Sequence, residues 1–180
     1  MREPIVPQLE GDEYLLWEAR QPERHELHHG FVVALVSGTR AHGTIALNLQ
    51  IVLRRVFPSP CETFGSDVKI EISASTFLYP DASVSCEPAD DDASSIRSPL
   101  FVAEILSKST RSYDLVEKRA FYRSLPSLRT YLIVHTEVRC VDVDTIVSGV
   151  WQTHRCAEET VALGSSLVTF DEIYAQTSVR

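Results

Sequence analysis

The clearest periodic pattern in the chain predicts an α-helix over residues 40–57. Apolar side chains recur there every three or four positions, while Asn48, Arg54 and Arg55 lie off their stripe, as expected for a helix with one buried face. Pro58 follows directly and ends the helix, because proline has no backbone N–H for a further turn. The apolar stripe consists of Ile45, Leu49, Val52, Leu53 and Val56.

A β-hairpin is predicted before this helix, over residues 25–35. Its second half is a β-branched apolar run, and His29-Gly30 separates it from the first half. Glycine tolerates a positive φ, so we expect the chain to turn at His29-Gly30.

The rest of the pattern predicts further strands and three shorter helices. Residues 1–10 contain two prolines and no period, so they are expected to be a flexible tail. The order of elements predicts a single domain over residues 1–180, of the α/β (α+β) class and built around one sheet. Helices are expected at residues 13–20, 111–124 and 170–175, and strands at 61–64, 68–72, 77–86, 100–106, 131–135, 138–143, 149–155 and 160–163.

Composition places the chain among ordinary globular proteins, with 44% hydrophobic and 23% charged residues. The longest unbroken apolar run, residues 31–36, is far too short for a transmembrane helix. No signal-peptide-like stretch occurs near the N-terminus, so we expect a cytoplasmic protein. The four cysteines, at positions 61, 86, 140 and 156, form no Cys-x-x-Cys pair. We therefore expect reduced thiols, with neither a structural zinc site nor a disulfide framework.

The charge distribution points to one region as the place where a polyanion would bind. The formal net charge is −8, which argues against a strong non-specific nucleic-acid binder. Residues 100–135 are the exception, because they carry six basic and three acidic side chains. We expect any nucleic-acid contact to lie there.

Two carboxylates occupy positions where the pattern predicts burial. Asp81 follows Pro80 inside the strand pattern of residues 77–86, and Glu104 interrupts the apolar run of residues 100–106. An isolated buried carboxylate costs several kcal/mol unless it meets a cation or hydrogen-bond donors. Each residue alone could be a strand-end side chain paired with an arginine. Together they favour a site for a hard cation such as Mg²⁺.

Pro80-Asp81, followed 23 residues later by Glu104, resembles the pattern of PD-(D/E)XK nucleases. More specifically, the chain resembles the Uma family of bacterial proteins described as restriction endonucleases. The resemblance implies a restriction-endonuclease-like core with a mixed central sheet flanked by helices, phosphodiester hydrolysis that requires Mg²⁺ or Mn²⁺, and a homodimer. The segments that carry it are residues 24–30, 41–42, 64–69, 79–84, 103–110 and 114–126.

The resemblance also assigns site residues. Asp81 and Glu104 become the metal ligands, and Glu26 becomes an additional acid that holds a second ion or tunes the first. The superfamily lysine normally lies two residues after the glutamate, where this chain has Leu106. The family supplies it from the next helix, which implies Lys118 here. The alternative for Lys118 is a plain helical ion pair with Asp114, four residues earlier.

The basic residues suggest which side chains contact the substrate. Fourteen of the 17 are arginine, and the three lysines, Lys69, Lys108 and Lys118, all lie beside the motifs above. We expect Lys69 and Lys108, together with Arg111, Arg119 and Arg123 from the net-positive stretch, to bind nucleic acid. The chain departs from the family at residues 107–110, Ser-Lys-Ser-Thr instead of Ser-Pro-Ser-Thr, and at His29-Gly30 instead of Asp-Gly.

A competing motif is His25-Glu26-Leu27-His28-His29, which matches the His-Glu-x-x-His signature of zinc hydrolases. That chemistry requires both terminal histidines on one helical turn. Gly30 and the following apolar run favour a strand instead, in which His25 and His29 would be about 13 Å apart. A chance match is therefore preferred.

The sequence leads to one main functional hypothesis and two alternatives. We expect a Mg²⁺-dependent endonuclease that hydrolyses nucleic-acid phosphodiesters, with DNA preferred as substrate. The first alternative is a catalytically silent DNA-binding or dimeric interaction module. The second is the zinc hydrolase implied by the motif at residues 25–29.

Overall fold

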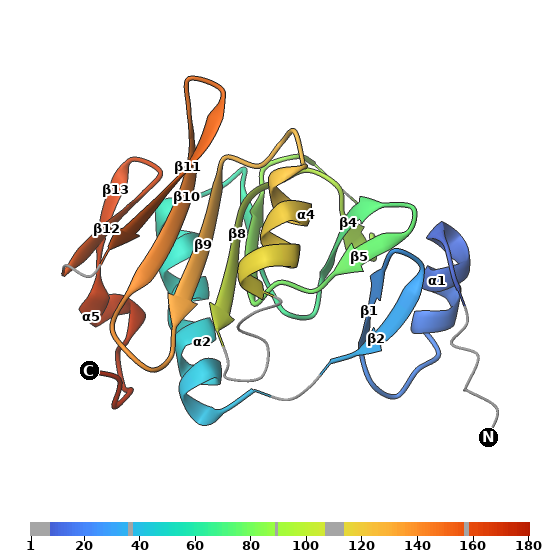
Figure 1. Cartoon of the computed structure of the whole chain (residues 1–180), viewed down its shortest axis with the longest axis horizontal. Coiled ribbons are helices and arrows are strands. Elements are labelled where there is room, and N and C mark those ends of the chain that lie inside the picture. The colour runs from blue at the N-terminus through green and yellow to red at the C-terminus, as the bar shows by residue number, and fades with distance from the viewer. Residues whose placement is uncertain (1–7, 36–37, 89, 107–113, 157–158) are drawn as a thin grey trace.

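The computed structural model describes residues 8–35, 38–88, 90–106, 114–156 and 159–180 (Figure 1). In these residues the strands form a six-stranded, a five-stranded and a two-stranded sheet. The mixed α+β class predicted from the sequence is confirmed, but the expectation of a single sheet is wrong, because the strands divide among these three sheets.

The six-stranded sheet is the larger layer and has the strand order β11-β10-β9-β8-β6-β3. β8 and β9 are parallel, with Glu104 beside Ile133, and the other neighbouring strands are antiparallel. The sheet is therefore mixed, as expected. Its strands are β3 (Glu62–Gly65), β6 (Ala82–Ser85), β8 (Pro99–Leu106), β9 (Thr130–His135), β10 (Val141–Val147) and β11 (Val150–Cys156).

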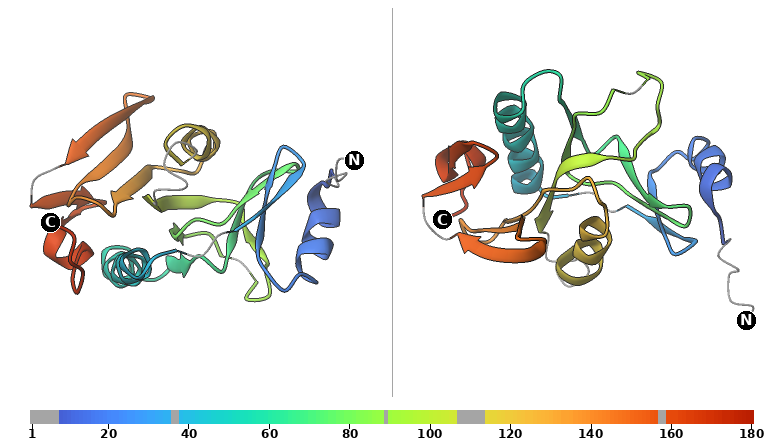
Figure 2. Two further views of the ribbon diagram at one scale, coloured as in Figure 1. Left: turned by 60° about the horizontal axis from the view of Figure 1, so that its bottom comes forward. Right: turned by 90° about the horizontal axis from the view of Figure 1, so that it is seen from above.

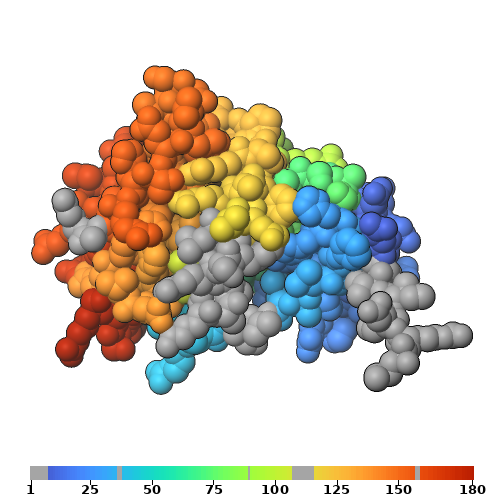
Figure 3. Space-filling view, in the orientation of Figure 1, coloured from blue at the N-terminus to red at the C-terminus, as the bar shows by residue number. Residues whose placement is uncertain are grey.

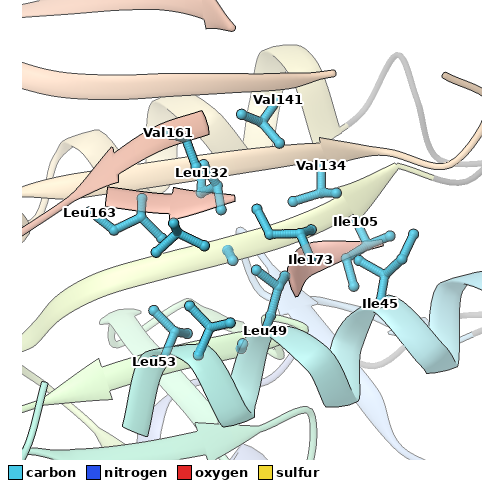
Figure 4. Packing of buried hydrophobic residues seen from close by; sticks show 14 of the residues in the cluster. Ile45, Leu49, Leu53, Ile105, Leu132, Val134, Val141, Val161, Leu163 and Ile173 are labelled. Carbon is cyan, nitrogen blue, oxygen red and sulfur yellow. The ribbon is translucent and has the colours of Figure 1, made fainter. Parts of the chain in front are cut away.

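Helices cover both faces of this sheet, as the view from above shows (Figure 2). The long helix α2 (Arg40–Val56) lies on one face, and its predicted apolar stripe packs against strand residues that include Ile105 and Val134 (Figure 4). The short helix α4 (Arg119–Arg123) lies on the other face, where Tyr122 packs with Val102 and Ile133. The two-stranded sheet β12 (Thr160–Leu163) and β13 (Ser166–Thr169), with helix α5 (Phe170–Ile173), completes the core beside α2.

The N-terminal part of the described chain builds the five-stranded sheet, in the order β2-β1-β5-β4-β7. The predicted hairpin is confirmed, because the chain turns at His29 (φ 51°) and Gly30 (φ 87°). Helix α1 (Gly11–Glu18) packs on this sheet through Tyr14, whose ring centroid lies 4.9 Å from that of Phe77. The strands are β1 (His25–His28), β2 (Phe31–Ala34), β4 (Lys69–Ser73), β5 (Thr76–Leu78) and β7 (Ser95–Ile96).

The predicted strand over residues 77–86 is wrong, because the chain forms two strands that belong to different sheets. β5 ends at Leu78 in the five-stranded sheet, and β6 begins at Ala82 in the six-stranded sheet. Pro80 lies between them and has no N–H to donate to a strand ladder. The three residues that join the two sheets therefore include Asp81.

The expectation of four reduced thiols also differs from the structure. Cys61 and Cys86 form a disulfide, whereas Cys140 and Cys156 form none. Glu62 pairs with Ser85 in the β3–β6 ladder, so the cysteines just outside this pair face each other. The two cysteines are 25 residues apart, and two further strands lie between β3 and β6 in the sequence. The sequence pattern therefore did not indicate this disulfide. Among the described residues, no helix has the length and apolar character needed to cross a membrane.

Candidate active site

Lys118 joins acidic residues from both large sheets. It is the last residue of a π-helical turn, Asp114–Lys118, which leads into α4. Its Nζ donates to Glu104 Oε1 at 3.3 Å and to Glu26 Oε1 at 2.8 Å. All three side chains are at least nine-tenths buried. The structure therefore brings together three of the residues that the family resemblance assigns to the site.

Glu26 lies on β1 and is held by several hydrogen bonds. The backbone N–H of Tyr79 donates to its Oε1 at 2.9 Å, and His28 Nε2 lies 2.9 Å from its Oε2. Burial raises the pKa of Glu26, but the Lys118 ammonium, His28 and the Tyr79 amide outweigh burial and hold that pKa below its ordinary value. Glu26 is therefore an anion at neutral pH. The hairpin that carries it abuts the α4 region at the surface (Figure 3), where the His29 and Phe121 rings lie 5.0 Å apart.

Asp81 is fixed beside Glu104 through the backbone of β8. Its Oδ2 accepts a hydrogen bond of 2.7 Å from the N–H of Ile105, the residue after Glu104. Its Oδ1 lies 3.2 Å from Nε2 of His42, which is in the first turn of α2. The carboxylate thus has defined partners on both oxygens, and it lies at the same level of the sheet as Glu104.

Tyr122 contributes a neutral hydrogen-bond donor from α4. Its hydroxyl donates to Glu104 Oε1 at 3.0 Å, and its side chain is fully buried. Burial and the charge of Glu104 raise the pKa of Tyr122 well above its ordinary value, so the hydroxyl keeps its proton. Lys118 and Tyr122 are four residues apart, and both meet the same carboxylate oxygen.

The donor atoms of the site suit a hard divalent cation. Glu26, Asp81 and Glu104 offer carboxylate oxygens, which Mg²⁺ and Mn²⁺ prefer. Lys118 is an ammonium that meets two of these three acids. The chemistry of these side chains therefore suits such an ion, and the sequence predicts Asp81 and Glu104 as its ligands.

The residues predicted to contact nucleic acid differ in burial and in the partners they bind. Lys69 is largely buried, with its Nζ 5.3 Å from the centre of the Tyr79 ring. Arg119 makes two hydrogen bonds of 2.7 and 2.8 Å to the fully buried Asp144, and Arg123 donates to the same carboxylate at 2.9 Å. Both arginines therefore hold α4 on the sheet. Lys108 and Arg111 lie outside the described residues, as does the Asp114 side chain.

The zinc-hydrolase motif does not have the required geometry. His25–His28 is a β-strand, and His29 lies in the turn after it. His25 packs beside Trp17 and Glu18, whereas His29 packs on Phe121. The two histidines therefore have different surroundings and do not share one helical turn.

Sequence reasoning missed His28 and His42 as members of the site. The sequence pattern gives neither of them a role at the site, yet His28 contacts Glu26 and His42 contacts Asp81. One signal could have found His28, because it lies two residues after Glu26 on the same face of a strand. His42 could have been considered from its position in the first turn of the predicted helix, where a side chain can reach residues beyond the helix end.

Comparison with known proteins identifies the family. The Uma2 family model, described as "Putative restriction endonuclease", matches residues 12–172. An uncharacterized protein of Synechocystis is 37% identical over 131 residues, which are 71% of this chain and 69% of the relative. A second uncharacterized Synechocystis protein is 30% identical over 131 residues, covering 70% of this chain and 74% of the relative.

A solved structure supports the fold. The crystal structure described as "a putative nuclease belonging to DUF820" from Anabaena variabilis matches with a TM-score of 0.73 and 16% identity, over 93% of this chain and 98% of that one. The restriction-endonuclease-like fold expected from the sequence is therefore confirmed. The protein belongs to the Uma2 family.

Proposed function

We propose that the protein is an endonuclease that hydrolyses DNA phosphodiester bonds with Mg²⁺ or Mn²⁺ as cofactor. The observation that carries the proposal is the buried cluster in which Lys118 bridges Glu26 and Glu104, with Asp81 fixed beside them. Family membership supports nuclease chemistry, and the solved neighbour is described as "a putative nuclease".

Each acid has a distinct part in this proposal. Asp81 and Glu104 hold the divalent cation, and Glu26 contributes further negative charge from the neighbouring sheet. When bound, the cation supplies Lewis-acid polarisation of the scissile phosphate and stabilises negative charge as it develops. The remaining work belongs to the side chains around the acids.

Lys118 is proposed to orient the attacking water and to offset charge in the transition state. Its ammonium donates to Glu26 and Glu104, and these two contacts fix its position between the acids. A fixed donor in a buried site loses little energy to reorganisation, which makes it effective against developing charge.

Tyr122, His28 and His42 are proposed as positioning residues. Each contacts a different acid: Tyr122 contacts Glu104, His28 contacts Glu26, and His42 contacts Asp81. Such contacts around ligand carboxylates restrict their rotation and tune their affinity for an ion.

Substrate and assembly follow from the family resemblance. We propose duplex DNA as substrate, a single domain, and a homodimer as the active form. Lys108 and Arg111 remain proposed DNA contacts, because they belong to the net-positive stretch of residues 100–135. Lys69 also stays a proposed DNA contact, although its side chain is largely buried beside Tyr79.

The test is cleavage of supercoiled plasmid with Mg²⁺, Mn²⁺ or excess chelator. Wild type should nick the plasmid only with a divalent ion, and Glu104→Gln and Asp81→Asn should each lose at least about 100-fold in rate. Asp91→Asn is a matched control, because Asp91 is exposed in a loop. Equal nicking by wild type and Glu104→Gln would refute the assignment. DNA binding without cleavage under every condition would favour the silent binding module.

A further inference from the structure

The hairpin formed by β9 and β10 holds a second cluster of metal-ligating side chains. His135 ends β9, Cys140 immediately precedes β10, and Asp142 is the second residue of β10. One ligand atom from each, namely an imidazole nitrogen, the thiol sulfur and a carboxylate oxygen, lies within 4.8 Å of the others. The three residues are 8%, 6% and 2% exposed. Such burial is unusual for a histidine and an aspartate, and it requires partners.

The backbone of this hairpin is fixed around the cluster. The N–H of His135 donates to the carbonyl of Cys140 at 3.1 Å. The Tyr174 hydroxyl accepts from the Cys140 N–H at 3.1 Å and lies 2.8 and 3.0 Å from the Cys140 and His135 carbonyl oxygens. The positions of two ligands are therefore set before any ion arrives, which reduces the cost of binding.

We propose that His135, Cys140 and Asp142 bind a borderline-soft divalent transition-metal ion of the Zn²⁺ class. Nitrogen, sulfur and oxygen ligands on one site are typical of zinc, and thiolate excludes Mg²⁺ as the preferred occupant. Three protein ligands leave a fourth tetrahedral position for water. Unlike the carboxylate cluster around Lys118, this site does not depend on the proposed nuclease activity.

Arg155 lies beside the cluster and forms an ion pair with Asp142. Its guanidinium donates to both oxygens of Asp142, at 2.6 and 2.9 Å, and its side chain is 63% exposed. A ligand carboxylate in a metal site is commonly oriented by such a donor. The guanidinium also balances negative charge when the thiolate and the carboxylate both bind the ion.

Metal binding changes the protonation of the cluster in a defined way. His135 Nε2 lies 3.0 Å from Asp142 Oδ2, so an ion bound by both atoms would replace this direct contact. Burial and the Asp142 charge raise the pKa of the Cys140 thiol, so the thiol is protonated at neutral pH. Because the thiolate is the form that binds a metal, binding releases the thiol proton.

The new site is separate from the carboxylate cluster, although both lie on the same face of the sheet. Leu106 pairs with His135, and Glu104 pairs with Ile133, in the β8–β9 ladder. Two residues along a strand correspond to about 6–7 Å. Saturating the acids with Mg²⁺ should therefore leave the nitrogen and sulfur ligands free to bind Zn²⁺ or Co²⁺.

The test is titration of the full-length protein with Co²⁺ and Zn²⁺ in excess Mg²⁺, without added thiol, so that Cys61 and Cys86 stay linked. Wild type should bind one Co²⁺ with a thiolate-to-metal charge-transfer band, and Zn²⁺ should displace it. Calorimetry of Zn²⁺ binding in two buffers of different ionisation enthalpy should show about one proton released.

Variants distinguish this site from other thiols. Cys140→Ser should abolish the charge-transfer band, and His135→Gln should weaken Zn²⁺ binding at least about 10-fold. Cys156→Ser, at the other cysteine outside the disulfide, should leave both unchanged. Circular dichroism and thermal unfolding check that each variant folds. Absence of stoichiometric Zn²⁺ binding by folded wild type, or a band that survives Cys140→Ser, would overturn the proposal.

Discussion

Lys118 Nζ lies 2.8 Å from Glu26 Oε1, although 92 residues separate the two side chains in the sequence. One belongs to the turn before α4 and the other to the N-terminal hairpin. The contact therefore links the parts of the chain that build the two large sheets. Both groups are buried, so removal of either takes a partner from a buried charge.

Lys118→Ala should remove nicking and also destabilise the protein. Loss of one partner from a buried charge pair costs about 3–5 kcal/mol, and here two acids lose their ammonium. Mg²⁺ should recover part of the lost stability, because the ion replaces positive charge between the acids. Thermal unfolding with and without Mg²⁺, beside the nicking assay, measures both effects, and Lys118→Arg is the charge-retaining control. If Lys118→Ala nicks plasmid as fast as wild type, a different lysine orients the attacking water.

Glu26 should make the stability of the protein fall in acid. Its pKa is lower in the folded protein than its ordinary value of 4.5, so its contribution is complete above pH 4.5. That contribution is lost as the pH falls through the lowered folded-state value. Denaturant unfolding of wild type and Glu26→Gln, from pH 7 to pH 3, should show a difference that shrinks below about pH 4.5. A difference that does not change with pH would contradict this assignment.

His42→Ala should lower the apparent affinity for Mg²⁺ more than it lowers the maximal rate of nicking. His42 lies 3.2 Å from Asp81 Oδ1 and restricts this carboxylate. Loss of such a contact typically costs about 10–100-fold in metal affinity. The Mg²⁺ concentration for half-maximal nicking should therefore rise by that factor, with a smaller change at saturating Mg²⁺. His154→Ala is the matched control, because His154 is exposed. An unchanged Mg²⁺ dependence would show that His42 does not position Asp81.

Arg119→Ala should reduce stability, because Arg119 makes two hydrogen bonds to the fully buried Asp144. Arg123 still pairs with Asp144, so we expect a loss of about 1–3 kcal/mol in the free energy of unfolding. Arg97→Ala, which removes an exposed pair with Glu71, should cost less than about 1 kcal/mol. Denaturant unfolding measures both. If the Arg119 variant keeps wild-type stability but loses DNA affinity, the arginine serves the substrate rather than the fold.

Local patterns predicted the helix and the hairpin well. The stripe from Ile45 to Leu53 is long and strongly periodic, and the helix it predicts is confirmed within one residue at each end. His29-Gly30 has the backbone freedom that a tight turn requires, and the turn is there. Both features depend on residues close in sequence, so the pattern alone was sufficient.

The missed features depend on contacts between distant segments. Cys61 and Cys86 face each other only because β3 pairs with β6, which no local pattern reveals. His42 meets Asp81 because the start of α2 lies beside the end of β5 and the start of β6. The family resemblance, rather than periodicity, named Glu26 and Lys118 as site residues, and the structure shows them in contact.

The short connection from Leu78 to Ala82 has a mechanical consequence. Tyr79 binds Glu26 through its N–H, Pro80 has a restricted φ, and Asp81 binds the backbone of β8. Three consecutive residues thus act as a stiff spacer between β5 in one sheet and β6 in the other. Inserting one glycine after Pro80 would shift Asp81 relative to Glu26 without altering either side chain, so the spacing between the acids is encoded in the length of this connection.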